Sequence, residues 1–177
     1  AKALLKEEGL STYDTTLSPI GLSLANRVSL QSTKAFSSGM IEVQDEASQI
    51  AAMLVDPKPN HFVLDFCAGS GGKSLAIAAA MAGKGQVVAT DTDEERLAKS
   101  KGRIKRSGIK NIKTRVLDPE NTNWQKRQRK SFDRVLVDAP CSGTGTWRRR
   151  PDEKWRFSEK DLDDYITAQD SILSEAS

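Results

Sequence analysis

Residues 61–74 read HFVLDFCAGSGGKS. A short apolar strand over 61–66 is followed by a glycine-rich loop, and an alanine-rich helix is predicted over 72–81, closed by Gly83. Glycines let the backbone approach a ligand closely, and the first N–H groups of a helix have no partner within the helix. The loop between this strand and this helix is therefore the first candidate binding site.

The segments on both sides continue the alternation of strand and helix. Further strands are predicted over 86–90, 112–117 and 132–137, and further helices over 92–107 and from Ser158 onward. The helix over 92–107 opens with Thr92-x-x-Glu95, the pattern of a capping box, and upstream Asp45 is predicted to cap a helix that stops before Pro57. This alternation predicts an α/β fold with a doubly wound, mostly parallel sheet of the Rossmann-like type.

The two ends of the chain differ from this central pattern. Residues 1–10 predict a short helix that ends at Gly9, and residues 11–43, rich in Ser, Thr and Gly with short apolar stretches, predict turns and short strands. We therefore expect a small N-terminal appendage over 1–39 before a main domain over 40–177. Only four strands are predicted, and the last helix runs to the final residues. We therefore expect the sheet to be incomplete on its C-terminal side, with one edge of the fourth strand unpaired.

The composition is that of an ordinary globular domain. The chain has 177 residues, of which 37% are hydrophobic, and its longest apolar run, residues 75–82, is too short to span a bilayer. Two cysteines, Cys67 and Cys141, and a single histidine form neither a disulfide framework nor a four-ligand zinc site. We expect no membrane partner, no metal and a reducing, cytoplasmic setting.

The net charge of +3 hides a strong segregation of charge. Residues 1–95 carry a net −5, residues 96–150 carry +13, and residues 151–177 carry −5. Three basic clusters in one segment, with the three tryptophans in or beside it, favour a nucleic-acid partner on whose bases the tryptophans could stack. The alternative is that the basic residues only solvate a helix face and two loops, and that the tryptophans serve packing.

In general, a glycine-rich turn between a strand and a helix can be one of three kinds of binding loop. A phosphate-binding P-loop needs glycine where Cys67 stands, and a dinucleotide fingerprint needs glycine or alanine where Ser74 stands. A nucleoside cofactor without a phosphate requirement remains. Asp91, at the end of the second predicted strand, can accept both hydrogen bonds of a ribose diol.

A carboxylate stands at the end of each predicted strand. Ligands of open α/β sheets bind at the carboxyl ends of the strands, so these four side chains are predicted to converge on one crevice. Each of them could instead be a helix cap or a turn residue. The four are Asp65, Asp91, Asp118 and Asp138.

Several long motifs in their order along the chain carry a resemblance to a known family. They are the loop quoted above, QDEAS at 44–48, DAPCSGTG at 138–145, RRRPD at 148–152 and KW at 154–155. Residues 40–177 thereby resemble the S-adenosylmethionine-dependent RNA cytosine-5 methyltransferases of the Sun/Nop2/Fmu family. The chain departs from the usual family loop, CAAPGGKT, at Gly69, Ser70 and Ser74, changes that should keep the turn. Residues 1–39 more weakly resemble the accessory RNA-binding region of bacterial members.

The resemblance implies a cofactor, a partner and a set of cofactor-binding residues. The cofactor is S-adenosylmethionine and the partner is RNA, with ribosomal RNA and its methylation as the expected role. Asp91 would hold the ribose, Asp118 the adenine amino group, and the loop the methionine end. The full implied set is Cys67, Ala68, Gly69, Ser70, Gly71, Gly72, Lys73, Asp91, Asp118 and Asp138.

The chemistry of cytosine-5 methylation requires a cysteine beside the cofactor. A thiolate that adds to carbon 6 makes carbon 5 nucleophilic, and a base then removes the carbon-5 proton. Cys67 lies in the cofactor loop, so Cys141 is better placed, unless it is a buried structural thiol. The family resemblance, however, assigns the attack to a later Thr-Cys motif, which these 177 residues lack, and gives Cys141 a part in product release.

The remaining roles also follow from the resemblance. Asp138 would recognise the amino group of a flipped-out cytosine, and Lys73 would orient that carboxylate or the ring. Arg148, Arg149 and Arg150 would contact phosphates near the target base, unless they form only a solvated loop. A non-catalytic cofactor- or RNA-binding module, and a DNA or small-molecule methyltransferase, are the alternative functions.

Overall fold

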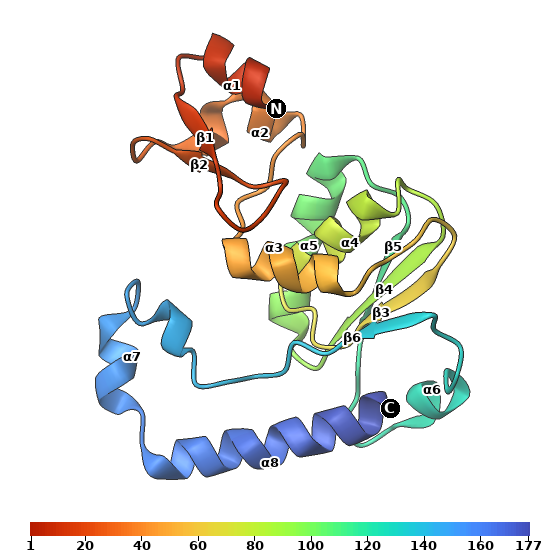
Figure 1. Ribbon diagram of the computed structural model, residues 1–177. Helices are drawn as coiled ribbons and strands as arrows, with labels where there is room; N and C mark the ends of the chain where they lie inside the picture. The colour runs from red at the N-terminus through yellow and green to blue at the C-terminus, as the bar shows by residue number, and fades with distance from the viewer. The chain divides into compact units, whose positions relative to one another are not determined.

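The computed structural model describes all 177 residues, which divide into two compact units, residues 1–136 and 137–177. The first unit contains a four-stranded sheet and a two-stranded sheet (Figure 1). The second contains a 3-10 turn, η2 (Thr144–Thr146), and two helices, α7 (Pro151–Arg156) and α8 (Glu159–Ala176). None of the helices combines the length and apolar character that crossing a membrane requires.

The predicted parallel sheet is confirmed. Its strands stand in the order β5-β4-β3-β6, and every neighbouring pair is parallel. The chain runs from β3 outward through β4 to β5, and then crosses back to place β6 on the other side of β3. The strand order therefore reverses beside β3, and α/β sheets bind their ligands at such a point. The strands are β3 (Phe62–Asp65), β4 (Gln86–Asp91), β5 (Ile112–Val116) and β6 (Arg134–Leu136).

Helices on one face of the sheet form the main core. The fully buried Val63 packs with Ile77 and Met81, and the same cluster takes in Ala52 and Val87. The helices that contribute to this part of the unit are α3 (Glu46–Leu54), α4 (Gly72–Ala80) and α5 (Glu94–Ser107).

The opposite face of the sheet carries an aromatic cluster. Phe62 precedes Val63 in the strand and therefore points to the other face. Its ring stacks on Phe132 with centroids 4.4 Å apart, and Trp124 of α6 (Asn123–Arg127) lies 6.5 Å from Phe132. Trp124 therefore serves packing.

Two of the three helix N-caps predicted from the sequence are confirmed. Asp45 Oδ1 accepts the N–H of Ala47 at 3.1 Å, and Ser158 forms a complete capping box with Asp161. The capping box predicted at Thr92 is wrong, because Asp93 is the cap and accepts the N–H of Arg96 at 2.9 Å. The physical reason is that Asp91 accepts the N–H of Asp93, which turns the chain one residue later than the pattern indicates.

Residues 1–39 contain the predicted short helix and short strands, together with two further short helices that were not predicted. The short strands are β1 (Thr12–Asp14) and β2 (Leu22–Leu24), which pair as an antiparallel hairpin. The predicted helix is α1 (Lys2–Glu7), and the two that were not predicted are the 3-10 helix η1 (Leu30–Ser32) and α2 (Lys34–Ser37). These residues belong to the same compact unit as the sheet, and the domain boundary at 39/40 stays a prediction.

One side chain ties this N-terminal region to α3. Glu46 Oε1 accepts the backbone N–H groups of Leu17 and Ser18 at 2.6 and 2.8 Å. These hydrogen bonds to the charged form lower the pKa of the Glu46 carboxyl below its usual value. A residue of the family-like motif at 44–48 therefore has a structural use.

Candidate functional site

The start of the glycine-rich loop is fixed to the neighbouring strand. The N–H of Ala68 donates to the carbonyl of Thr90 at 2.8 Å, and the Thr90 hydroxyl donates to the carbonyl of Phe66 at the same distance. Gly71, at φ +78°, is the residue from which α4 begins. The left-handed conformation there favours glycine, because a Cβ would strain it.

The glycines of the loop lie directly on α5. A Cβ added at Gly69 would stand 3.0 Å from Arg96 Nη2, one at Gly71 would stand 2.8 Å from Ser100 Cβ, and one at Gly72 would stand 3.2 Å from Arg103 Nη2. The three α5 positions follow the spacing i, i+4, i+7 and so form one stripe of the helix. The sequence predicts that these glycines make room for a ligand, and the structure adds that they make room for α5.

Asp91 joins the loop to the ends of β4 and β5. Its carboxylate is 7% exposed, and its Oδ2 accepts the N–H of Gly69 at 2.7 Å while its Oδ1 accepts the N–H of Asp93 at 2.9 Å. A carboxylate has about four lone-pair sites, so further hydrogen bonds can be accepted. The N–H of Leu117 donates to the Asp91 carbonyl at 2.9 Å, which places Asp118 directly beside this strand end.

Asp65 and Asp118, two of the three other carboxylates at strand ends, have different surroundings. Asp65 is fully buried, and its Oδ2 accepts the Ser74 hydroxyl at 2.6 Å, so it fixes the first turn of α4. Ser74, which replaces the family threonine, keeps the hydroxyl that makes this bond. Asp118 is exposed and accepts the N–H of Glu120 at 2.9 Å.

The remaining predicted residues divide between the two units. Lys73, half-buried, lies in the first turn of α4 with the loop. Asp138, Cys141 and the arginines at 148–150 belong to the second unit. Asp138 follows the last residue of β6 by two positions and is exposed. Cys141 is exposed as well, which overturns the alternative of a buried structural thiol.

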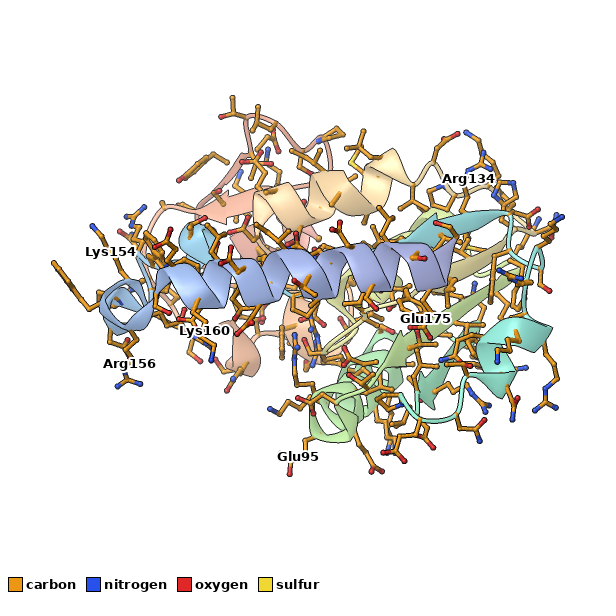
Figure 2. The ribbon with its side chains drawn as sticks, turned by 90° about the horizontal axis from the view of Figure 1, so that it is seen from below. Glu95, Arg134, Lys154, Arg156, Lys160 and Glu175 are labelled. Carbon is orange, nitrogen blue, oxygen red and sulfur yellow. The ribbon has the colours of Figure 1, made fainter.

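The arginine run is exposed and precedes α7. Arg150 donates to Glu153 at 2.9 Å, a hydrogen bond to the charged form that raises the pKa of the guanidinium above its usual value. At the junction of α7 and α8, three more basic side chains gather at one end of α8, and Glu175 lies at its other end (Figure 2). They are Lys154, Arg156 and Lys160.

The three tryptophans have separate uses. Trp124 packs in the aromatic cluster, and Trp147 lies 6.3 Å from the Phe157 ring. Trp155 is 83% exposed, and the Lys154 ammonium lies over one face of its ring, 5.6 Å from the centroid, so the other face is open to a partner. Of the stacking roles that the sequence allows, only that of Trp155 remains supported by exposure.

A parallel sheet whose order reverses beside a glycine-rich loop, with a carboxylate at the end of the next strand, is typical of Rossmann-like α/β proteins. A family model described as 16S rRNA methyltransferase RsmB/F matches residues 52–177. Ribosomal RNA small subunit methyltransferase B of Proteus mirabilis (strain HI4320) is 36% identical over 175 residues, 97% of this chain and 40% of that relative.

Two solved structures from Pyrococcus horikoshii are also similar. NSun6 with SFG has a TM-score of 0.73 at 28% identity, over 88% of this chain and 40% of that chain. A methyltransferase homolog protein has a TM-score of 0.71 at 31% identity, over 84% of this chain and 48% of that chain.

The chain therefore belongs to the 16S rRNA methyltransferase RsmB/F family, and the resemblance read from its motifs is confirmed. It spans 40% of the length of the Proteus mirabilis relative.

Proposed function

We propose that this chain is the cofactor-binding part of an S-adenosylmethionine-dependent RNA cytosine-5 methyltransferase that acts on ribosomal RNA. The observation that carries the proposal is the Asp91 carboxylate at the end of β4, hydrogen-bonded to Gly69 of the loop where the strand order reverses. NSun6, one of the similar structures, is described with SFG, an S-adenosylmethionine analogue. A cytoplasmic setting fits such a substrate.

The residues of the first unit would divide the cofactor between them. Asp91 has acceptor capacity left for the two ribose hydroxyls, and Asp118 stands at the neighbouring strand end for the adenine amino group. The loop over 67–73 would bind the methionine end with the first N–H groups of α4. When bound, the cofactor supplies an electrophilic methyl group.

The basic charge supports RNA as the substrate. Residues 96–150 carry a net +13, and Arg148 to Arg150 are exposed at the end of this segment. Phosphate contacts by such side chains position RNA without reading its sequence. The exposed Trp155 adds a surface on which an unpaired base can stack.

The catalytic assignments rest on the family motifs. Cys141 is an exposed thiol in a Pro-Cys segment. Asp138 would accept a hydrogen bond from the amino group of the target cytosine, and Lys73 would orient the Asp138 carboxylate or the cytosine ring. We assign product release to Cys141, because the family places the attacking thiol in a Thr-Cys pair that these residues lack.

Labelled-methyl transfer to unmodified ribosomal RNA tests the role of Cys141. With the 177-residue chain we expect cofactor binding without transfer. Transfer that is abolished by Cys141→Ala would instead make Cys141 the nucleophile.

Calorimetric titration with S-adenosylmethionine tests the cofactor site. We expect binding by the wild-type chain and a loss of about 100-fold in affinity in Asp91→Ala, because two ribose hydrogen bonds and the Gly69 anchor disappear together. Glu94→Ala, an exposed acidic side chain in the first turn of α5, is the matched control. Unchanged affinity in Asp91→Ala would refute the assignment.

A further inference from the structure

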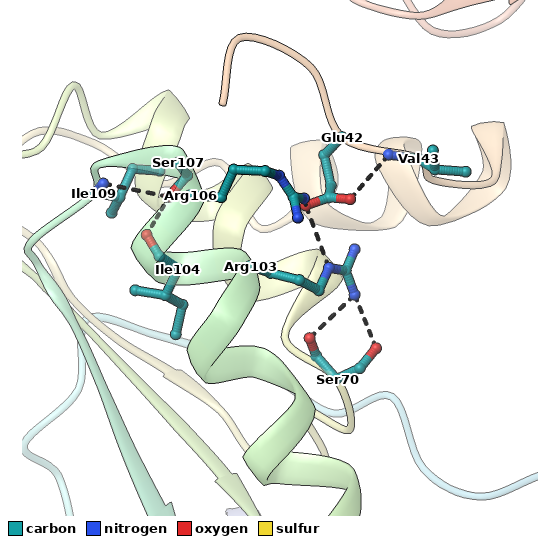
Figure 3. Close-up of polar contacts among 8 residues, drawn as sticks. All are labelled: Glu42, Val43, Ser70, Arg103, Ile104, Arg106, Ser107 and Ile109. Carbon is teal, nitrogen blue, oxygen red and sulfur yellow. Dashed lines mark hydrogen bonds and ion pairs between the residues drawn. The ribbon is translucent and has the colours of Figure 1, made fainter. Parts of the chain in front are cut away.

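Glu42 connects the segment before α3 to α5. Its Oε2 lies 3.3 Å from Arg103 Nε and is also hydrogen-bonded by Arg106 Nη2 (Figure 3). The three side chains are only 21–24% exposed. Arg106 also lies over the Phe36 ring, 3.9 Å from its centroid. Both arginines are therefore half-buried and paired within the chain.

Arg103 makes a second set of contacts that Arg106 lacks. Its Nη1 donates to the carbonyl of Ser70 at 3.0 Å and to the Ser70 hydroxyl at 2.8 Å. A guanidinium is a planar group whose donors have fixed directions, so an anchor on Nε sets where Nη1 points. Glu42 holds the Nε edge, and the loop receives the Nη1 edge (Figure 3).

These contacts fix a second point of the loop, one residue after the point that Asp91 holds. The N–H of Gly69 is held by Asp91, and the carbonyl of the next residue, Ser70, is held by Arg103. Because a peptide unit is planar, the position of the Ser70 carbonyl also sets the direction of the Gly71 N–H. That N–H donates to the Ala68 carbonyl at 2.9 Å and closes the turn. The loop shape that presents the N-terminus of α4 therefore depends on Arg103.

We propose that Arg103, oriented by Glu42, is a positioning residue that pre-organises the glycine-rich loop for S-adenosylmethionine. The identity of the ligand rests on the proposed function, whereas the effect on the loop rests on the contacts of Arg103 with Ser70 and Glu42. This positioning makes the segment around Glu42 a determinant of cofactor affinity, although the Glu42 carboxylate is bonded to Arg103 and Arg106 and not to the loop. A loop that is already ordered loses less conformational entropy on binding.

The test compares two arginines that share one partner. Arg103→Ala and Arg106→Ala each remove an ion pair with Glu42, but only the first removes the contacts to Ser70. In calorimetric titrations with S-adenosylmethionine we expect Arg103→Ala to lose about tenfold in affinity. Arg106→Ala should lose less than about twofold. Equal losses in the two variants would overturn the proposal.

Amide hydrogen exchange of the cofactor-free chain gives a second readout. The N–H groups of Gly69 and Gly71 should exchange faster in Arg103→Ala and unchanged in Arg106→Ala. Unchanged exchange in Arg103→Ala would refute the positioning role even if affinity falls. If the wild-type chain binds no cofactor, the proposed function fails, whereas the exchange rates still decide the role of Arg103.

Milder variants keep the test valid if Arg103→Ala does not fold. Arg103→Lys retains the charge but not the fork of donors, so it should show most of the loss. Glu42→Gln should weaken binding in the wild-type background and have no further effect in an Arg103→Lys background, because the two residues act in series. Additive losses would contradict the proposed order.

Discussion

The glycine-rich loop and the Pro-Cys segment carry the two halves of the expected chemistry, yet they are built differently. The loop over 67–73 is held by Asp91, by Thr90 and by the stripe on α5, and most of these contacts are buried. In the segment over 137–150 the candidate residues Asp138 and Cys141 are exposed. The proposed cofactor site is thus pre-organised by the fold, whereas the residues proposed to meet RNA are presented on the surface.

The largest effect is expected from a methyl group added to the loop. Gly71→Ala places a Cβ 2.8 Å from Ser100 Cβ at φ +78°, so the free energy of unfolding should fall by about 2–4 kcal/mol. Gly143→Ala in the other segment, at φ +67°, meets the flexible Thr146 side chain at 3.3 Å and should cost only about 1–2 kcal/mol.

Urea unfolding measures both changes. Gly102→Ala is the control, because its Cβ would meet nothing within 4 Å inside α5 and should stabilise the chain by about 0.5–1 kcal/mol. A loss in Gly143→Ala as large as that in Gly71→Ala would contradict the difference between the two regions.

The second prediction addresses the arginine run. Replacing Arg148, Arg149 and Arg150 by Gln should leave the free energy of unfolding within about 0.5 kcal/mol, because the three side chains are exposed. The slope of log affinity for RNA against log salt should become shallower by up to about 3. Lys84→Gln, an exposed lysine outside the basic segment, is the control. An unchanged slope in the triple variant would favour the solvated-loop interpretation.

The smallest effect concerns pH and the anchor between the N-terminal region and α3. Because the pKa of Glu46 is lowered in the folded chain, its contribution to stability is present above its ordinary value of 4.5 and is lost as pH falls through the lowered value. Glu46→Gln should therefore be less stable than wild type at neutral pH, and the difference should shrink in acid. Urea unfolding at neutral and at acidic pH measures this difference in the free energy of unfolding. Glu7→Gln, at an exposed position, is the control, and its difference from wild type should be the same at both pH values.

Local rules predict much of the fold. Apolar runs identify β3 and β4, and the caps at Asp45 and Ser158 follow from side chains that bond within three residues. The prediction at Thr92 fails because the Asp91 carboxylate, two residues upstream, takes the N–H of Asp93, a second local hydrogen bond that competes with the capping-box pattern. Short helices such as α6 have too few residues for a periodic signal.

The sequence predicts only part of the candidate site. The position of Asp91 after a strand indicates its place, and the structure puts it there. The use of Asp65 as an internal anchor and the pairing of Glu42 with arginines more than 60 residues away depend on tertiary packing. The only signal for the α5 stripe is the spacing of positions 96, 100 and 103, which has no meaning until the loop is known to lie against it.

An NMR titration of the chain with S-adenosylmethionine tests most directly whether the loop and Asp91 form the cofactor site. We expect the backbone amide shifts to concentrate at residues 67–73 and around Asp91 and Asp118, and to be small at Arg148 to Arg150. Absence of shifts at saturating cofactor, or shifts confined to residues 137–150, would contradict this expectation.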